Sequence, residues 1–174
     1  MLKTLLISQI LVWASQGAGW SLDGCKRAKD PYRGNPPVPK GLVRSGGVTQ
    51  RLIPLAGQIP DLREALAYAR ADNVVGRAVY PAAARCLVHP DLAKALVRAA
   101  ALARGQGFGL LVYDCYRPWR AQVALWSACP KRGLVADPAR GSKHNRGVAV
   151  DLTLYRLADS VAVSMPSGYD DLSR

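Results

Sequence analysis

One stretch near the middle of the chain limits the possible folds more than any other. Apolar side chains recur there every three or four residues, which predicts a helix over residues 91–104. Pro90 and Asp91 suit the start of this helix, and Gly105 suits its end. The apolar run at residues 109–116 follows closely and is typical of a buried strand. The sequence therefore predicts a globular domain that contains both kinds of element.

Three further segments extend this pattern. Pro118 favours the start of a second helix over residues 119–127, and residues 148–157 alternate as a strand does. A short helix is expected over residues 61–68, with Asp61 as its N-cap and an acidic residue three positions later. Helices and strands mixed in this way predict an α+β domain, with a small antiparallel sheet flanked by helices.

The size and charge of the chain exclude several classes of protein. Its 174 residues suit one domain, and 49% hydrophobic residues are too many for a disordered chain. The net charge is +12, but the basic residues are scattered and no motif that reads DNA or RNA accompanies them. We therefore expect no nucleic-acid partner. With only two histidines and one glutamate, these residues cannot form a three-histidine metal site.

The N-terminal segment resembles a targeting sequence. Residues 1–14 hold one lysine and a short apolar run, and small residues follow at positions 17–19. This layout predicts a signal peptide over residues 1–19, and so a protein exported to the periplasm or the extracellular space. The run is too short to span a bilayer, although a buried N-terminal helix is an alternative. Residues 20–51 are rich in Pro and Gly and predict an extended, poorly packed lead-in.

Export would allow the cysteines of the chain to form disulfides. Four cysteines allow three complete pairings, among which the sequence does not choose. Buried cysteines that pack as small apolar residues are the alternative. The four residues concerned are Cys25, Cys86, Cys115 and Cys129.

A short motif near the C-terminal end has the chemistry of a metal site. Its pattern is S-x-H-x-x-G-x-A-x-D, from Ser142 to Asp151. The imidazole of His144 and the carboxylate of Asp151 are both good zinc ligands, and Gly147 allows the sharp turn that lets them converge. The alternative is a capping aspartate beside a surface histidine. This motif predicts a zinc site made by His144 and Asp151.

A second motif, residues 113–118, lies where the predicted strand ends and a helix begins. Arg117 is at this corner, where functional side chains are common. Its planar guanidinium could bind an anionic oxygen through two N–H groups and stabilise a developing oxyanion. A salt bridge to Asp114, or simple exposure to solvent, is the alternative.

Together these motifs resemble those of the zinc-dependent D-alanyl-D-alanine dipeptidases. Residues 68–77, Y-A-R-A-D-N-V-V-G-R, are similar to that family's Y-A-x-x-D-N-F-x-G motif. Residues 85–87 and the Y-D-C-Y-R-P sequence at 113–118 follow in the family's order. The resemblance covers roughly residues 52–173. It implies the fold shared by these D-Ala-D-Ala peptidases and the hedgehog signalling proteins.

The resemblance also implies roles for particular residues. It makes His144 and Asp151 zinc ligands and Arg117 the group that stabilises the transition state. It further implies that Tyr68 and Ser142 bind substrate, which would be a small D,D-dipeptide from peptidoglycan turnover. No membrane span is expected, and the sequence does not predict an oligomeric state.

One part of the family pattern is missing from this sequence. The family completes its site with a later E-x-x-H segment, which supplies a general base and a third zinc ligand, and no such segment occurs before Arg174. Glu64 lies far upstream and does not fit that motif. His89, next to a helix start, is better explained by a capping or surface role. The dipeptidase-like domain, residues 52–174, is therefore expected to be truncated at its C-terminus.

Two functions follow from these observations. The first is hydrolysis of D-alanyl-D-alanine by a zinc dipeptidase. The second is an inactive homologue that binds D-amino acids or cell-wall fragments, with its positive charge attracting anionic material. Stoichiometric zinc and turnover would distinguish the enzyme from the binding protein.

Overall fold

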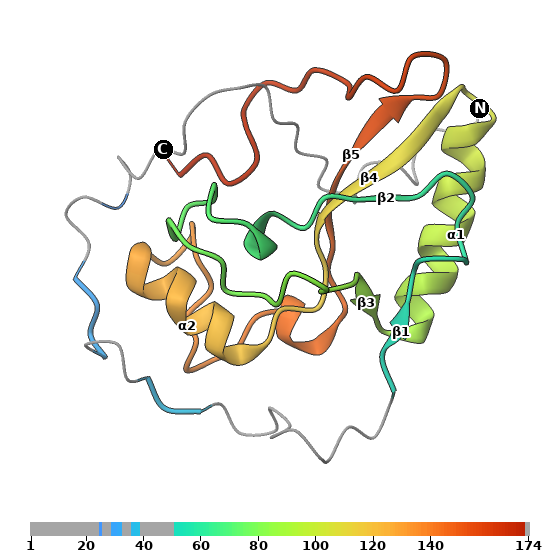
Figure 1. Cartoon of the computed structure of the whole chain (residues 1–174). Coiled ribbons are helices and arrows are strands. Elements are labelled where there is room, and N and C mark those ends of the chain that lie inside the picture. Colours follow the sequence, from blue (N-terminus) through green and yellow to red (C-terminus); the bar gives the residue numbers. More distant parts are fainter. Residues whose placement is uncertain (1–24, 26–28, 33–35, 39–50, 173–174) are drawn as a thin grey trace, which may run out of the picture.

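The computed structural model describes Cys25 and residues 29–32, 36–38 and 51–172 (Figure 1). The predicted signal peptide lies outside the described residues. Within them, no helix is both long and apolar enough to cross a membrane. The elements in chain order are β1 (Ile53–Pro54), β2 (Arg63–Glu64), the 3-10 helix η2 (Ala67–Ala69), β3 (Leu87–Val88), α1 (Pro90–Arg104), β4 (Phe108–Asp114), α2 (Trp119–Ala128), the 3-10 helix η3 (His144–Arg146) and β5 (Asp151–Arg156).

Helix α1 confirms the strongest prediction from the sequence. Pro90 occupies its first turn and Gly105 caps its end, as the pattern indicates. The N-cap is His89, whose Nδ1 accepts a hydrogen bond of 3.2 Å from the backbone N–H of Asp91. The capping role expected for His89 is therefore confirmed. Strand β4 and helix α2 also form where the sequence predicted a strand and a second helix.

The main sheet has three strands, with β4 between β2 and β5. Strand β5 is antiparallel to β4, but β2 is parallel to it, so the sheet is mixed rather than purely antiparallel as predicted. A separate antiparallel pair joins β1 and β3. The α+β class is thus correct, and its sheet is small.

The predicted helix over residues 61–68 is wrong. Asp61 has a φ of 59°, in the left-handed region, where an N-cap residue does not lie. The next residues instead form β2 along the edge of β4, and the N–H of Ala65 donates to the carbonyl of Val112 at 2.8 Å. Pairing with a buried strand outweighs local helix preference here, and only one turn of 3-10 helix follows.

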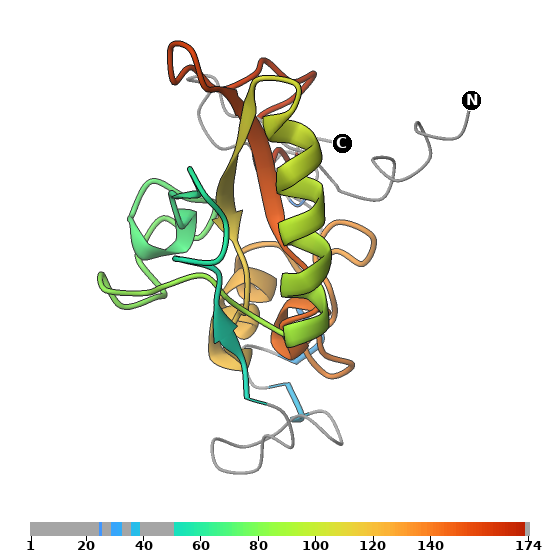
Figure 2. The same cartoon turned by 90° about the vertical axis from the view of Figure 1, so that its right-hand side faces the viewer.

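Side chains of β4 alternate between two cores. Leu110 and Val112 pack with the buried face of α1, including Leu96. Tyr113 belongs to the other core, which includes Trp126 of α2. Figure 2 shows α1 running alongside β4 and β5. The sheet is therefore covered on both faces.

A few described residues of the lead-in make specific contacts with the domain. Cys25 forms a disulfide with Cys129 at the end of α2. The carboxylate of Asp30 accepts a hydrogen bond from the indole N–H of Trp126, and the hydroxyl of Tyr32 donates to Asp137 at 3.0 Å. These contacts hold the segment against α2 and the loop that follows it.

The remaining cysteines, Cys86 and Cys115, form a second disulfide, with 5.3 Å between their Cα atoms. This bond joins the residue before β3 to the residue after β4. Of the three pairings open to the sequence, the structure therefore has 25–129 and 86–115, and none of the four is a free thiol.

Candidate functional site

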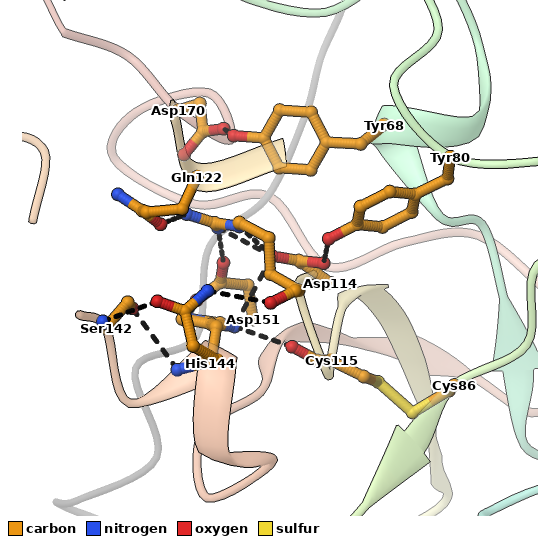
Figure 3. A network of polar contacts seen from close by, with 12 residues as sticks. Tyr68, Tyr80, Cys86, Asp114, Cys115, Gln122, Ser142, His144, Asp151 and Asp170 are labelled. Carbon is orange, nitrogen blue, oxygen red and sulfur yellow. Dashed lines mark hydrogen bonds and ion pairs between the residues drawn. A yellow bond between two sulfur atoms is a disulfide. The ribbon is translucent and has the colours of Figure 1, made fainter. Parts of the chain in front are cut away.

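A bulge in β4 brings two carboxylates together. The register pairs Val112 with Leu152 but Asp114 with Asp151, so Tyr113 is the extra residue on β4. In a regular strand, Asp114 would share the core face of Val112. The bulge instead places it beside Asp151, on the opposite face of the sheet (Figure 3).

The loop that carries His144 is fastened to the end of β4. The backbone N–H of Arg117 donates to the carbonyl of His144 at 3.1 Å, and the side-chain amide of Asn145 donates to the carbonyl of Arg117 at 2.7 Å. The hydroxyl of Ser142 accepts from the N–H of His144 at 3.2 Å. These bonds fix η3 beside β4, although the two are distant in the sequence.

The imidazole of His144 lies between a backbone carbonyl and Asp151. Its Nδ1 is 2.9 Å from the carbonyl oxygen of Cys115, which only accepts, so Nδ1 carries the proton. In the neutral ring Nε2 then has a free lone pair, and this nitrogen is 3.5 Å from Oδ1 of Asp151. The two ligands predicted from the sequence are therefore side by side, with Nε2 of His144 facing Oδ1 of Asp151.

Arg117 is buried rather than exposed. Both Nε and Nη2 donate to Oδ2 of Asp114, at 2.9 and 2.6 Å, and Nη1 donates to Gln122 at 2.8 Å. Nη2 also lies 3.8 Å from Oδ2 of Asp151. The salt bridge to Asp114 that the sequence left open as an alternative is therefore present. Three of the five guanidinium N–H groups are used, which leaves two for a ligand.

Asp114 is the site residue that sequence reasoning missed. It is fully buried, and its second oxygen accepts from the hydroxyl of Tyr80 at 2.6 Å. It also lies 3.3 Å from Nδ1 of His144 and joins His144 and Asp151 in the acidic and histidine cluster of the described residues. Its place in the Y-D-C-Y-R-P motif was visible, but nothing in the pattern indicated the bulge.

The charges of the cluster alter its pKa values. Burial lowers the pKa of His144, but Asp151 and Asp114 more than offset this and raise it above its usual value. Burial raises the pKa of Asp151, but His144 and Arg117 lower it by more, so the pKa is below its usual value and this carboxylate stays ionised. The pair is thus held as an anionic oxygen facing an imidazole.

A family model described as D-ala-D-ala dipeptidase matches residues 48–174, which is most of the chain and includes the whole cluster. The chain belongs to this dipeptidase family. The resemblance carried by the motifs is therefore confirmed.

Three curated members of the dipeptidase family show how far the likeness extends. A D-alanyl-D-alanine dipeptidase of Escherichia coli (strain K12) is 44% identical over 124 residues, which cover 71% of this chain and 63% of that protein. The D-alanyl-D-alanine dipeptidases of Enterococcus faecium and Streptomyces coelicolor are 37% and 38% identical, each over 59% of this chain and 60% of theirs. The chain spans about three fifths of the length of these relatives.

The cluster opens on a pocket of about 320 Å³. Arg117, Ser142, His144 and Asp151 all line it, so the predicted ligands and the predicted substrate residue Ser142 share one cavity. Tyr68 is not one of the residues that line this pocket. Its ring lies against the guanidinium of Arg117, with 5.0 Å between Cζ and the ring centroid. Substrate contact by Ser142 and Tyr68 stays a prediction.

Asp170 also lines the pocket and accepts a hydrogen bond from the hydroxyl of Tyr68. Burial raises the pKa of Asp170 to about 6. Because the folded pKa exceeds that of an unfolded aspartate, the stability that this group contributes is present below about pH 4 and is lost as the pH rises through 6.

Asp170→Asn should therefore stabilise the protein at neutral pH. We expect the free energy of unfolding of the variant, relative to wild type, to rise by about 1–3 kcal/mol between roughly pH 4 and 7. Urea titrations across this range measure the difference. Asp159→Asn is the control, because Arg156 lowers the pKa of Asp159 and the difference should run in the opposite direction. A difference for Asp170→Asn that does not vary with pH would contradict the raised pKa.

Gly147 ends η3 with a φ of 67°, a left-handed conformation that other residues rarely adopt. A Cβ atom there would lie 2.5 Å from Cδ2 of Leu52 and 3.2 Å from the backbone N of His89. Gly147→Ala should therefore cost more than the about 1–2 kcal/mol of left-handed strain alone. The matched control is Gly76→Ala, with a φ of 73° and nothing within 4 Å. Equal losses in urea unfolding would show that the close approach to His89 is unimportant.

Proposed function

We propose that this protein hydrolyses D-alanyl-D-alanine, with Zn²⁺ held by His144 and Asp151. The observation that supports this most directly is the 3.5 Å separation of His144 Nε2 and Asp151 Oδ1 in a pocket that Arg117 also lines. Membership of the dipeptidase family and the names of the relatives support the substrate class. Peptidoglycan, which contains D-alanyl-D-alanine, is the proposed source of the substrate.

The donor atoms suit zinc. Two donors that each lie about 2.0–2.2 Å from a tetrahedral zinc ion are roughly 3.3–3.6 Å apart, which matches the observed separation. The contact of Nδ1 with the Cys115 carbonyl is also the arrangement that metal-binding histidines usually have. Asp114 is less suited, since both its oxygens already accept hydrogen bonds. The described residues thus supply two of the usual three protein ligands.

The residues around the metal have distinct tasks. Zinc, when bound, polarises a peptide carbonyl and lowers the pKa of a water molecule. Attack on that carbonyl places negative charge on its oxygen, and Arg117 can meet this charge with its two remaining N–H groups. Asp114 and Gln122 hold the guanidinium in place beforehand, so little reorganisation is needed.

A binding protein without catalysis is the second candidate, and one observation favours it. Glu64, the one glutamate of the sequence, contacts the backbone N–H of Cys86 at 3.4 Å and lies 4.0 Å from Arg85. It is not part of the cluster in the described residues, so no glutamate there is placed to act as a general base. Such a protein would bind D-amino acids or cell-wall fragments without cleaving them.

Release of D-alanine from D-alanyl-D-alanine tests the proposal. We expect turnover that a chelator abolishes and added Zn²⁺ restores, and none with L-alanyl-L-alanine. Asp151→Asn should lose turnover, because it removes an anionic ligand while keeping the side-chain size. Binding of the dipeptide without any release of D-alanine would favour the binding protein instead.

The same assay tests the proposed compartment. Two disulfides support a location outside the cytoplasm, because disulfides persist mainly in oxidising compartments. Activity should therefore appear in the periplasmic or extracellular fraction of expressing cells. Activity confined to the cytosolic fraction would contradict export.

A further inference from the structure

The carbonyl that orients His144 belongs to a cysteine in a disulfide. We propose that the Cys86–Cys115 disulfide is a positioning element, which fixes the tautomer and orientation of the His144 imidazole and thereby strengthens metal binding. The carbonyl oxygen of Cys115 is 2.9 Å from Nδ1 of His144. This inference rests on the proposed function only for the role of His144 as a metal ligand.

The disulfide holds the carbonyl from the side opposite to His144. Cys86 and Cys115 are 0% and 2% exposed, so the bond lies in the core and not on a mobile surface. The carbonyl of Cys86 accepts from the N–H of Leu55 at 3.0 Å, and the N–H of Tyr116 donates to the carbonyl of Leu87 at 2.9 Å. The residues on both sides of the bond are therefore anchored, and Figure 3 shows the disulfide next to the cluster.

The contact decides which ring nitrogen can bind metal. A carbonyl accepts only, so it keeps the proton on Nδ1 and leaves Nε2 with its lone pair toward Asp151. The other acceptor near Nδ1 is Oδ2 of Asp114, at 3.3 Å, which already accepts two hydrogen bonds from Arg117. Without a fixed Cys115 carbonyl, the ring loses its better partner and is free to turn or to change tautomer.

The second disulfide provides a matched control. Cys25–Cys129 closes a loop with a sequence separation of 104, against 29 for Cys86–Cys115. Loop-closure entropy therefore predicts that Cys25–Cys129 contributes more to stability. In the described part of the chain, neither of its cysteines is a hydrogen-bond partner of His144. A purely structural role for both bonds would make removal of Cys25–Cys129 the more damaging change in every measurement.

The experiment compares Cys86→Ala/Cys115→Ala with Cys25→Ala/Cys129→Ala. Ring ¹⁵N chemical shifts of metal-free protein at alkaline pH report which nitrogen of His144 carries the proton. His89→Asn assigns the only other histidine while keeping a capping side chain. Competition with a fluorescent chelator measures the dissociation constant for Zn²⁺. If Cys86→Ala/Cys115→Ala does not fold, reduction of the folded Cys25→Ala/Cys129→Ala variant removes Cys86–Cys115 alone and gives the same readouts.

We expect loss of Cys86–Cys115 to convert a single Nδ1-protonated tautomer into a mixture and to weaken Zn²⁺ binding by about 10–100-fold. The control should keep both properties near wild type, although it unfolds more easily. An unchanged tautomer and Zn²⁺ affinity without Cys86–Cys115 would overturn the inference and leave the metal site standing. A changed tautomer in a protein that binds no Zn²⁺ would instead support the positioning and contradict the proposed metal site.

Discussion

Arg117→Ala is expected to lower the free energy of unfolding by about 3–5 kcal/mol, because it leaves a buried carboxylate without its partner. Asp114 is 0% exposed, and one of its oxygens accepts both hydrogen bonds that Arg117 donates to it. The hydroxyl of Tyr80 carries no charge, and Nδ1 of His144, 3.3 Å from Asp114, already contacts the Cys115 carbonyl at 2.9 Å. Urea or thermal unfolding of the metal-free protein measures this loss.

The control for this prediction is Arg156→Ala. Arg156 pairs with Asp159 at 2.8 Å, with the same spacing of three residues, but the two side chains are 50% and 47% exposed. Exposed pairs contribute little to stability, so this change should barely alter unfolding. If the two variants lost equal stability, the buried pair would have no special weight in the fold.

The same residue should affect catalysis separately from stability. In protein kept below its unfolding transition, Arg117→Ala should lower kcat by about 10²–10³, the usual effect of losing one oxyanion donor. KM should change less, because the charge on the carbonyl oxygen develops mainly in the transition state. Arg117→Lys should restore activity only in part, since an ammonium lacks the planar arrangement of donors. A rise in KM alone would mean that Arg117 anchors the substrate in its ground state.

Features of the fold and the site could be predicted from the sequence where the residues that determine them are close together in the chain. Helix α1 was predictable because its cap, its apolar spacing and its terminal glycine all lie within seventeen consecutive residues, 89–105. The convergence of His144 and Asp151 was predictable for the same reason, since Gly147 and the motif spacing are local. Strand β2 was not, because its conformation depends on pairing with β4, far along the chain.

Asp114, the site residue that was missed, also depends on pairing between distant segments. Alternation along β4 predicts that Asp114 shares the core face with Val112, where a carboxylate would be costly. A single extra residue in the bulge moves it to the site, and the signal for that bulge lies in the pairing with β5. The contacts of the described lead-in residues likewise depend on a disulfide and on side-chain contacts from distant segments.

His144→Ala should weaken Zn²⁺ binding by more than the about 100-fold that loss of an outer-shell partner can cost, because it removes a donor atom itself. Two ligands on one ion share the cost of assembling the site, so a single remaining carboxylate should hold zinc poorly. The dissociation constant, measured by chelator competition on dialysed protein, tests this directly.

His89→Ala is the matched control for His144→Ala. It removes the only other imidazole of the chain, and with it a helix cap, from a residue outside the cluster of described residues. We expect it to lower stability by about 1 kcal/mol, as loss of a capping side chain usually does, while Zn²⁺ affinity stays unchanged. For His144→Ala we expect the reverse, a loss of Zn²⁺ affinity with little loss of stability. Its ring makes one hydrogen bond to a backbone carbonyl, and its removal leaves the salt bridge between Asp114 and Arg117 in place. If both variants retained zinc equally, the ion would be bound elsewhere, and His144 would be a buried polar residue with no part in the chemistry.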